Sequence, residues 1–88
     1  TMEGLQIGRD VHYVLLPQES RHNRPDHRPA KIIVFWGTEG MTNLAVFMDG
    51  TNDCDWYGPT TVVPVYWATS RRYSAGMEPG TWHWVEPA

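Results

Sequence analysis

Cysteine is almost absent from this sequence, because Cys54 is the single one among 88 residues. One cysteine excludes an intramolecular disulfide and a zinc site built from several thiolates. Cys54 stands between Asp53 and Asp55, whose carboxylates favour the neutral thiol and argue against a catalytic nucleophile. This cysteine usage fits a reducing compartment, and we expect the protein in the cytoplasm.

Long apolar runs and net positive charge are missing as well. No stretch is long enough for a bilayer and no charged-then-apolar leader opens the chain, so we expect neither a membrane protein nor an exported one. The formal charge of −3 argues against a protein that coats nucleic acid through a basic surface. Most positive residues nevertheless gather in the segments 21–31 and 71–72, which leaves a local anion site as a hypothesis.

Motifs for catalysis are not found. No serine lies in a Gly-x-Ser-x-Gly turn, and the turn 37–40 has neither the lysine nor the following helix of a phosphate loop. The acids Asp49, Asp53 and Asp55 lack the central glycine and terminal glutamate of a calcium loop. We therefore predict a protein that is not an enzyme and has no cofactor.

The four histidines are His12, His22, His27 and His83. The spacing of His22 and His27 fits no standard zinc pair, and we interpret both as solvated loop residues. His83 lies between two tryptophans, on the opposite face of a predicted strand, where we expect it to be exposed. The sequence thus predicts no metal site.

What is abundant is β-forming sequence. Segments rich in β-branched and aromatic residues alternate with stretches that hold nearly all the Gly, Pro, Asp and Asn, a pattern typical of an all-β fold. We expect one domain over residues 1–88, with residues 1–6 either disordered or foreign to the natural chain. The predicted strands are Val11–Leu16, Ala30–Trp36, Leu44–Met48, Thr60–Trp67 and Thr81–Val85.

Five short strands favour a strongly bent antiparallel sheet that closes into a small barrel of the Src-homology-three type, because closure protects the edges. The alternative is an open antiparallel sheet that dimerises through an aromatic face. The apolar run Ala30–Trp36 predicts a strand buried on both faces, and Pro64 predicts an edge strand or a bulge. We assign Tyr13, Trp36 and Trp84 to the core, and allow one helical turn within 69–74.

Arginines combined with aromatic residues are the best candidates for a binding site. Arginine can hold phosphate oxygens with two hydrogen bonds, and aromatic rings offer faces on which a base can stack. The rival interpretation is that the arginines face solvent and the rings form the core. The candidate ligand-binding residues are Arg21, Arg24, Arg28, Trp56, Tyr57, Trp67, Arg71, Arg72 and Tyr73.

Three short motifs resemble a family of small proteins of unknown function found in actinobacterial phages and prophages. These motifs are Gly8-x-x-Val11-His12-Tyr13, the apolar segment Ala30–Val34, and the ending Gly80-Thr81-Trp82-His83-Trp84. The family often carries a cysteine before the second strand, where this chain has Arg28-Pro29, so no cysteine role is transferred. The resemblance implies a phage or prophage origin and a small binding protein in the cytoplasm of a host cell.

We therefore expect a non-enzymatic binding module that captures a small anionic ligand, such as a nucleotide of host defence signalling. It would act alone or as a small homo-oligomer. The alternative is a module for protein interaction or virion association, with Trp82, Trp84 and the Trp56-Tyr57 loop as anchors.

Overall fold

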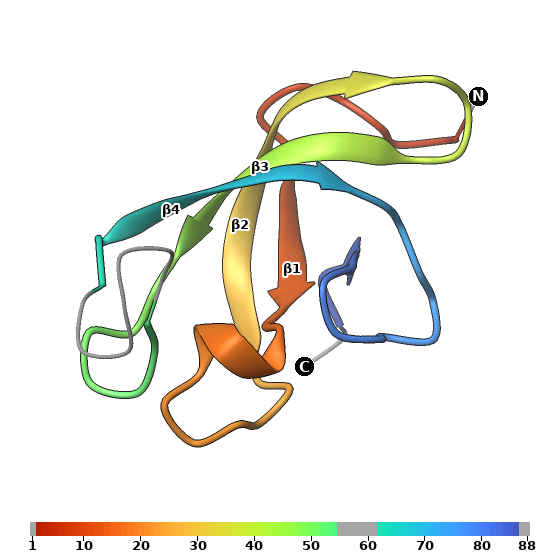
Figure 1. Ribbon diagram of the computed structural model, residues 1–88. Helices are drawn as coiled ribbons and strands as arrows, with labels where there is room; N and C mark the ends of the chain where they lie inside the picture. Colours follow the sequence, from red (N-terminus) through yellow and green to blue (C-terminus); the bar gives the residue numbers. More distant parts are fainter. Residues whose placement is uncertain (1, 55–61, 87–88) are drawn as a thin grey trace.

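The protein folds as a single five-stranded antiparallel sheet, which confirms the all-β prediction (Figure 1). The computed structural model describes residues 2–54 and 62–86. The strand order is β4-β3-β2-β1-β5, so β4 and β5 form the two edges. A 3-10 turn, η1 (Pro17–Glu19), follows β1. The strands are β1 (Asp10–Val14), β2 (His27–Trp36), β3 (Met41–Phe47), β4 (Val65–Arg71) and β5 (Trp82–Trp84).

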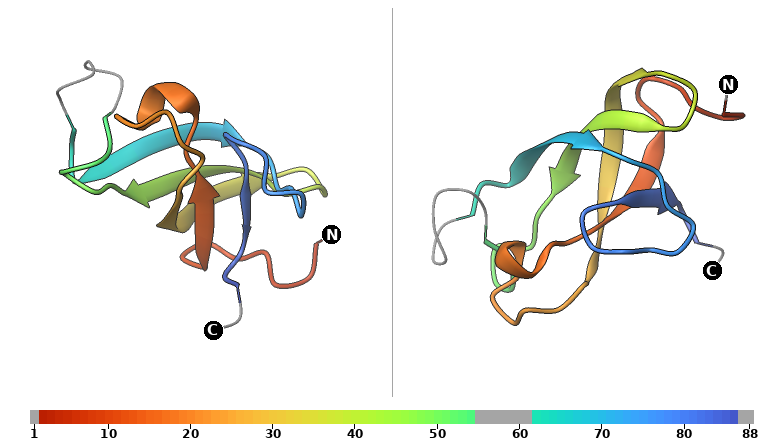
Figure 2. Two further views of the ribbon diagram at one scale, coloured as in Figure 1. Left: turned by 90° about the horizontal axis from the view of Figure 1, so that it is seen from below. Right: turned by 45° about the vertical axis from the view of Figure 1, so that its right-hand side comes forward.

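The bend of the sheet originates in β2. This ten-residue strand pairs with β1 from His27 to Lys31 and with β3 from Ala30 to Trp36. The register shifts between Ile32 and Val34, which marks an irregularity of the β-bulge kind that increases local twist. As a result β3 and β4 cross over β1 in Figure 1, and both views in Figure 2 show the same crossing of the two parts of the sheet.

The bent antiparallel sheet is as predicted, but it does not close into a barrel, so the favoured closure of the Src-homology-three type is wrong. Among the described residues, the two edges meet only after β4 has ended, in an isolated parallel bridge between Tyr73 and Trp82. Two hydrogen bonds support the bridge, from Trp82 N–H to Arg72 O and from Ser74 N–H to Trp82 O. With only three residues, β5 is too short to extend this contact into a ladder.

The core lies on the concave face of the bent sheet and is built by alternation along each strand. Val11 and Tyr13 of β1 point inward, and so does Trp82 of β5, whose side chain is fully buried. Trp82 also donates its indole Nε1–H to the carbonyl of Gly40, at 2.8 Å. The other buried members of this cluster are Leu5, Leu15, Ala30, Ile32, Leu44, Val46, Tyr66 and Ala68.

Two core predictions for β2 are wrong. Its residues alternate between buried and exposed instead of being buried on both faces, because no second layer covers the outer face of this part of the sheet. Trp36 belongs to that outer face and is 45% exposed. By contrast, Tyr13 is fully buried, and Trp84 is half-buried against the core as expected.

The ends of the strands show further outcomes. β4 is an edge strand, as the proline predicted, and Pro64 directly precedes it and accepts a hydrogen bond from Met48 N–H. No helical turn forms at 69–74, because β4 continues through Arg71. Leu5 is buried in the core, so residues 2–6 contribute to the fold.

Gly40 tests how closely the core packs beneath the turn between β2 and β3. Its φ is +83°, and an added Cβ would lie 2.8 Å from Tyr73 Cβ and 3.1 Å from Trp82 Cζ2. Gly37 has a similar φ of +71° but open space around it. We expect Gly40→Ala to lower the free energy of unfolding by roughly 2 kcal/mol more than Gly37→Ala does. Urea unfolding measures both, and equal losses would contradict this packing.

Candidate metal centre

Three histidines lie on one face of the sheet, on neighbouring strands. His12 in β1 and His83 in β5 are directly opposite each other in the antiparallel pair. His27, the first residue of β2, is paired with Val14, two residues beyond His12 along β1. Because Tyr13 and Trp82 point into the core, their neighbours His12 and His83 must point to the opposite face.

A carboxylate completes the group. Glu86 follows β5 and accepts hydrogen bonds from Nδ1 of His12, Nε2 of His83 and, at 2.7 Å, Nδ1 of His27. The rings of His27 and His83 meet edge to face with their centroids 4.7 Å apart. One potential ligand atom from each of the four side chains lies within 4.8 Å of the other three. We call these four residues the histidine cluster.

His83 is the buried member of the histidine cluster, and the prediction that it is exposed is wrong. It is only 3% exposed, since His27 and Glu86 lie against the outer side of its ring. Its second ring nitrogen, Nδ1, is also buried and has no hydrogen-bond partner among the described residues. An unpaired buried polar group costs about 1–3 kcal/mol, so the internal hydrogen bonds alone do not account for a histidine here.

The electrostatics of the cluster keep the carboxylate charged. Hydrogen bonding from His83 is the largest influence that lowers the pKa of Glu86, to about 2, with smaller contributions from His12 and His27. Partial desolvation acts in the opposite direction but is outweighed. An ionised oxygen donor therefore faces three imidazoles at neutral pH.

These donors match the preferences of a divalent transition ion. Imidazole nitrogen suits zinc, copper, nickel and iron, and carboxylate oxygen is a common fourth ligand. A tetrahedral ion with bonds of about 2.1 Å places its ligand atoms about 3.4 Å apart. The separations of at most 4.8 Å in the histidine cluster need side-chain shifts of only about 1 Å to reach that geometry.

Sequence reasoning missed the cluster because its members are far apart in the chain. Zinc spacing rules look for close pairs, and the only close pair here is His83 with Glu86, on a strand and the residues after it. Both His22 and His27 were interpreted as solvated loop residues. The exposed His22 does lie in a loop, beside Asn52, but His27 is the first residue of β2, so its assignment to a loop is wrong. The available signal was alternation, which sends His12 and His83 away from core aromatic neighbours.

Arg28, a predicted ligand residue, is bound to a buried acid instead. Its Nε and Nη2 donate to the carboxylate of Asp53 at 2.6 and 2.8 Å. Asp53 is fully buried and also accepts the backbone N–H of Asp49. The pKa of Arg28 is raised, mainly by the hydrogen bond to Asp53. This pair fastens the start of β2 to the loop after β3.

Arg71 is likewise turned inward. Its Nη2 lies 3.7 Å from a carboxylate oxygen of Glu19, which is 3% exposed, and its guanidinium lies over the ring of Tyr13. The Tyr13 hydroxyl donates to Glu19 at 2.8 Å. Burial first, and then the charge of Glu19, raises the pKa of the Tyr13 phenol. Arg71 therefore belongs to an internal polar network under η1.

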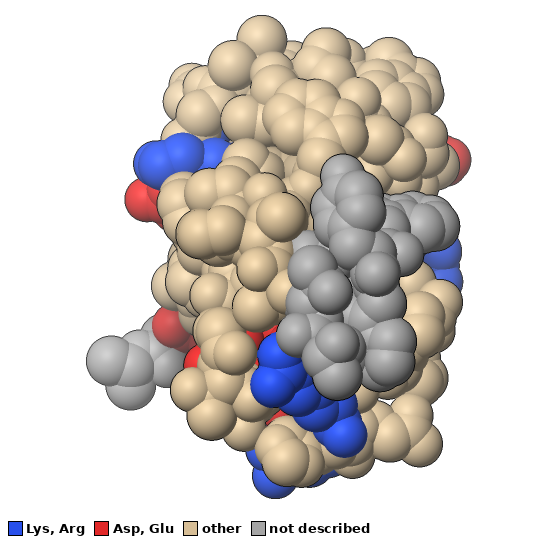
Figure 3. All heavy atoms as spheres, turned by 60° about the vertical axis from the view of Figure 1, so that its left-hand side comes forward, with Lys and Arg blue, Asp and Glu red and all other residues tan. Residues whose placement is uncertain are grey.

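The other candidate residues of the loop before β2 are also paired. Arg21 Nε donates to the carbonyl of Asp53, and Arg24 lies 3.5 Å from the carboxylate of Asp26. In Figure 3 the basic side chains at the lower end of the face have acidic atoms beside them. Trp56 and Tyr57 lie outside the described residues.

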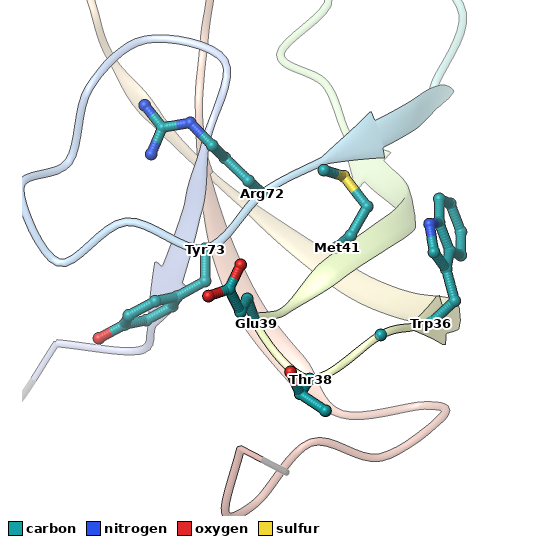
Figure 4. A pocket seen from close by; sticks show the side chains of 7 residues that line it. Trp36, Thr38, Glu39, Met41, Arg72 and Tyr73 are labelled. Atoms are coloured by element: carbon teal, nitrogen blue, oxygen red, sulfur yellow. The ribbon is translucent and has the colours of Figure 1, made fainter.

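Of the predicted set, Arg72 and Tyr73 line a pocket. This open pocket of about 570 Å³ lies beside the turn between β2 and β3. Figure 4 shows Arg72 and Tyr73 on one side and Trp36 and Met41 on the other, with Glu39 in the same pocket.

The distribution of tryptophans between core and surface differs from the one expected for an interaction module. Trp82 is fully buried and cannot serve as a surface anchor. Trp67, which was predicted as a ligand residue, is 50% exposed on the outer face of β4. Among the described aromatic residues, the most exposed are Trp67, Trp36 and Phe47, and none of these three belongs to β5.

Comparisons with family models, curated proteins and solved structures find no match for this chain. Within residues 2–54 and 62–86, no helix combines the length and apolar character needed to cross a membrane.

The pairing of Arg28 with Asp53 predicts a structural cost for its removal. Arg28→Ala leaves a buried carboxylate without its cation and should lower the free energy of unfolding by about 3 kcal/mol. Arg24→Ala, whose side chain is 58% exposed, should change it by less than about 0.5 kcal/mol. Denaturant unfolding of both variants measures the difference. A small effect for Arg28→Ala would show that this arginine is free to bind a ligand.

Proposed function

We propose that this protein is a small metal-binding β module that holds a divalent transition ion between His12, His27, His83 and Glu86. The observation that carries the proposal is the convergence of three imidazole nitrogens and one carboxylate within 4.8 Å. Zinc is the reference metal, because it accepts nitrogen and oxygen donors in a four-coordinate site and requires no redox chemistry.

The competing interpretation is a purely hydrogen-bonded cluster, in which Glu86 accepts from the three imidazole rings. That arrangement explains the contacts of Glu86. It leaves the buried Nδ1 of His83 without a hydrogen-bond partner among the described residues, and nothing in it offsets the cost of burying this nitrogen. A bound ion changes this balance, since metal–ligand bonds in proteins contribute far more free energy than one unpaired buried ring nitrogen costs.

A metal ion in the histidine cluster would cross-link strands of the sheet. Its ligands come from β1, β2 and β5, so one ion joins three strands. β5 gains most, because it has only three residues and pairs along its length with β1 alone. It carries Trp82, the largest fully buried side chain. Metal binding should therefore stabilise the core through β5.

Zinc should stabilise the folded protein measurably. At a free concentration 100 times the dissociation constant, a ligand of the folded state adds about 2.7 kcal/mol, which for a domain of this size raises Tm by roughly 10–20 °C. We expect this shift in the wild type and in His22→Ala, and its loss in His83→Ala. Differential scanning fluorimetry of the chelator-treated protein, with and without zinc, measures it.

The matched histidine variant gives this experiment its control. His22 is exposed and lies outside the histidine cluster, so adventitious zinc binding to exposed histidines would respond to His22→Ala as strongly as to His83→Ala. That outcome, or a wild type with no zinc-dependent shift, would refute the proposal.

A second candidate function is the capture of a small anionic ligand in the pocket at the turn between β2 and β3. The specific support is that Arg72 lines this pocket together with the aromatic side chains of Tyr73 and Trp36. Arginine pairs with phosphate oxygens and the rings offer stacking faces, which suits a nucleotide. Glu39 lines the same pocket and would repel phosphate, which favours a ligand with a single phosphate group.

Nucleotide binding in this pocket depends on Arg72. In a fluorescence titration with mono-, di- and cyclic nucleotides, Arg72→Ala should weaken binding about tenfold or more, since a charge-assisted hydrogen bond contributes about 1.5–3 kcal/mol. Arg24→Ala should bind as the wild type does. If Arg24→Ala loses binding instead, the ligand lies at the loop before β2, and if no nucleotide binds, this second function is refuted.

A further inference from the structure

The four members of the histidine cluster are not anchored equally. His12, His27 and His83 belong to strands β1, β2 and β5, where the ladder fixes the backbone of each. Glu86 lies two residues beyond the end of β5, after the half-exposed Val85. Glu86 is therefore the ligand whose backbone has the least support and whose side chain can leave with the smallest rearrangement.

The position of the Glu86 carboxylate shows which kind of group the three imidazoles can bind. Nitrogen atoms from all three rings converge on its two oxygens. The point between the rings thus has the size and polarity for an oxyanion, and here the oxyanion is supplied by the chain itself. A carboxylate or phosphate group of another molecule offers the same kind of oxygen atoms.

One side of the histidine cluster is open to such a molecule. The side chains of His12, His27 and Glu86 are 27%, 35% and 32% exposed, whereas His83 closes the opposite side with 3%. An external anion can therefore approach from solvent along the route that Glu86 occupies. Neutral imidazoles leave the full charge of a divalent ion once the glutamate departs, and this charge attracts an anion.

The number of protein ligands decides whether a zinc-type centre is closed or reactive. Four protein ligands are typical of a structural site, and three with one open position are typical of a site that binds external molecules. Resting on the proposed metal centre, we infer that Glu86 is its exchangeable ligand and that a small oxyanion, a carboxylate or a phosphate, takes the coordination position of Glu86. The three histidines are then the permanent ligand set.

Cobalt(II) makes this inference testable, because its visible absorption reports the number and type of ligands. The experiment titrates cobalt into the wild type, Glu86→Ala and the control Glu3→Ala, in which an exposed glutamate outside the cluster is removed. Each cobalt-loaded protein is then titrated separately with acetate and with inorganic phosphate. Chloride-free, non-coordinating buffer keeps the position available.

Glu86→Ala should still bind cobalt, with affinity lowered about 10–100-fold, while His83→Ala should lose specific binding. The visible spectrum of cobalt-loaded Glu86→Ala should shift on addition of acetate or phosphate. If Glu86 holds the position about nine-tenths of the time in the wild type, the anion dissociation constant should be about tenfold lower in Glu86→Ala. Glu3→Ala should match the wild type, and the stronger of the two anions identifies the ligand class.

Three negative results would each refute a different part of the inference. A wild type that binds no cobalt refutes the metal centre itself. A wild type that binds cobalt and a Glu86→Ala variant that does not would make Glu86 an indispensable ligand and overturn the exchange. A Glu86→Ala variant that binds cobalt but shows no response to either anion would overturn the oxyanion assignment.

Discussion

The antiparallel pairing of β5 with β1 is the contact on which the rest of the structure depends. It sets Tyr13 opposite Trp82 and His12 opposite His83. Because side chains alternate along a strand, this one register places two aromatic rings in the core and two imidazoles on the other face. A slip by one residue would exchange the two sets. The core and the histidine cluster therefore share a single geometric cause.

Local sequence predicted the fold to the extent that local chemistry controls it. Four predicted strands are found with shifted ends, and the fourth in sequence runs from Val65 to Arg71 instead of from Thr60 to Trp67, because β-branched and aromatic segments bounded by Gly, Pro and Asp form strands in most contexts. Closure of the sheet was not predictable in this way, since it depends on how far β4 and β5 extend past each other. For the same reason Trp36 looked like a core residue: an apolar run does not reveal whether a second layer covers its outer face.

The candidate site was harder to predict because its chemistry depends on long-range pairs. Arg28 and Arg71 looked like ligand residues, but the folded chain supplies Asp53 and Glu19 as buried partners from other segments. The histidine cluster joins strands from both ends of the chain, and no spacing rule connects His12 with His83. Strand register brings both groups together, and register emerges only from the complete sheet.

A metal centre of this kind would stabilise a small open sheet that has few other sources of stability. A domain of this size buries a modest share of its surface, and its single cysteine removes the disulfide as a stabilising device. The edge strand β5 brings the largest buried side chain, Trp82, with only three residues of pairing. Three imidazoles on the face opposite Trp82 can hold that strand through an ion without occupying core volume. In the proposed centre, attachment of β5, completion of the core and binding of an outside anion would all depend on one short segment, residues 82–86.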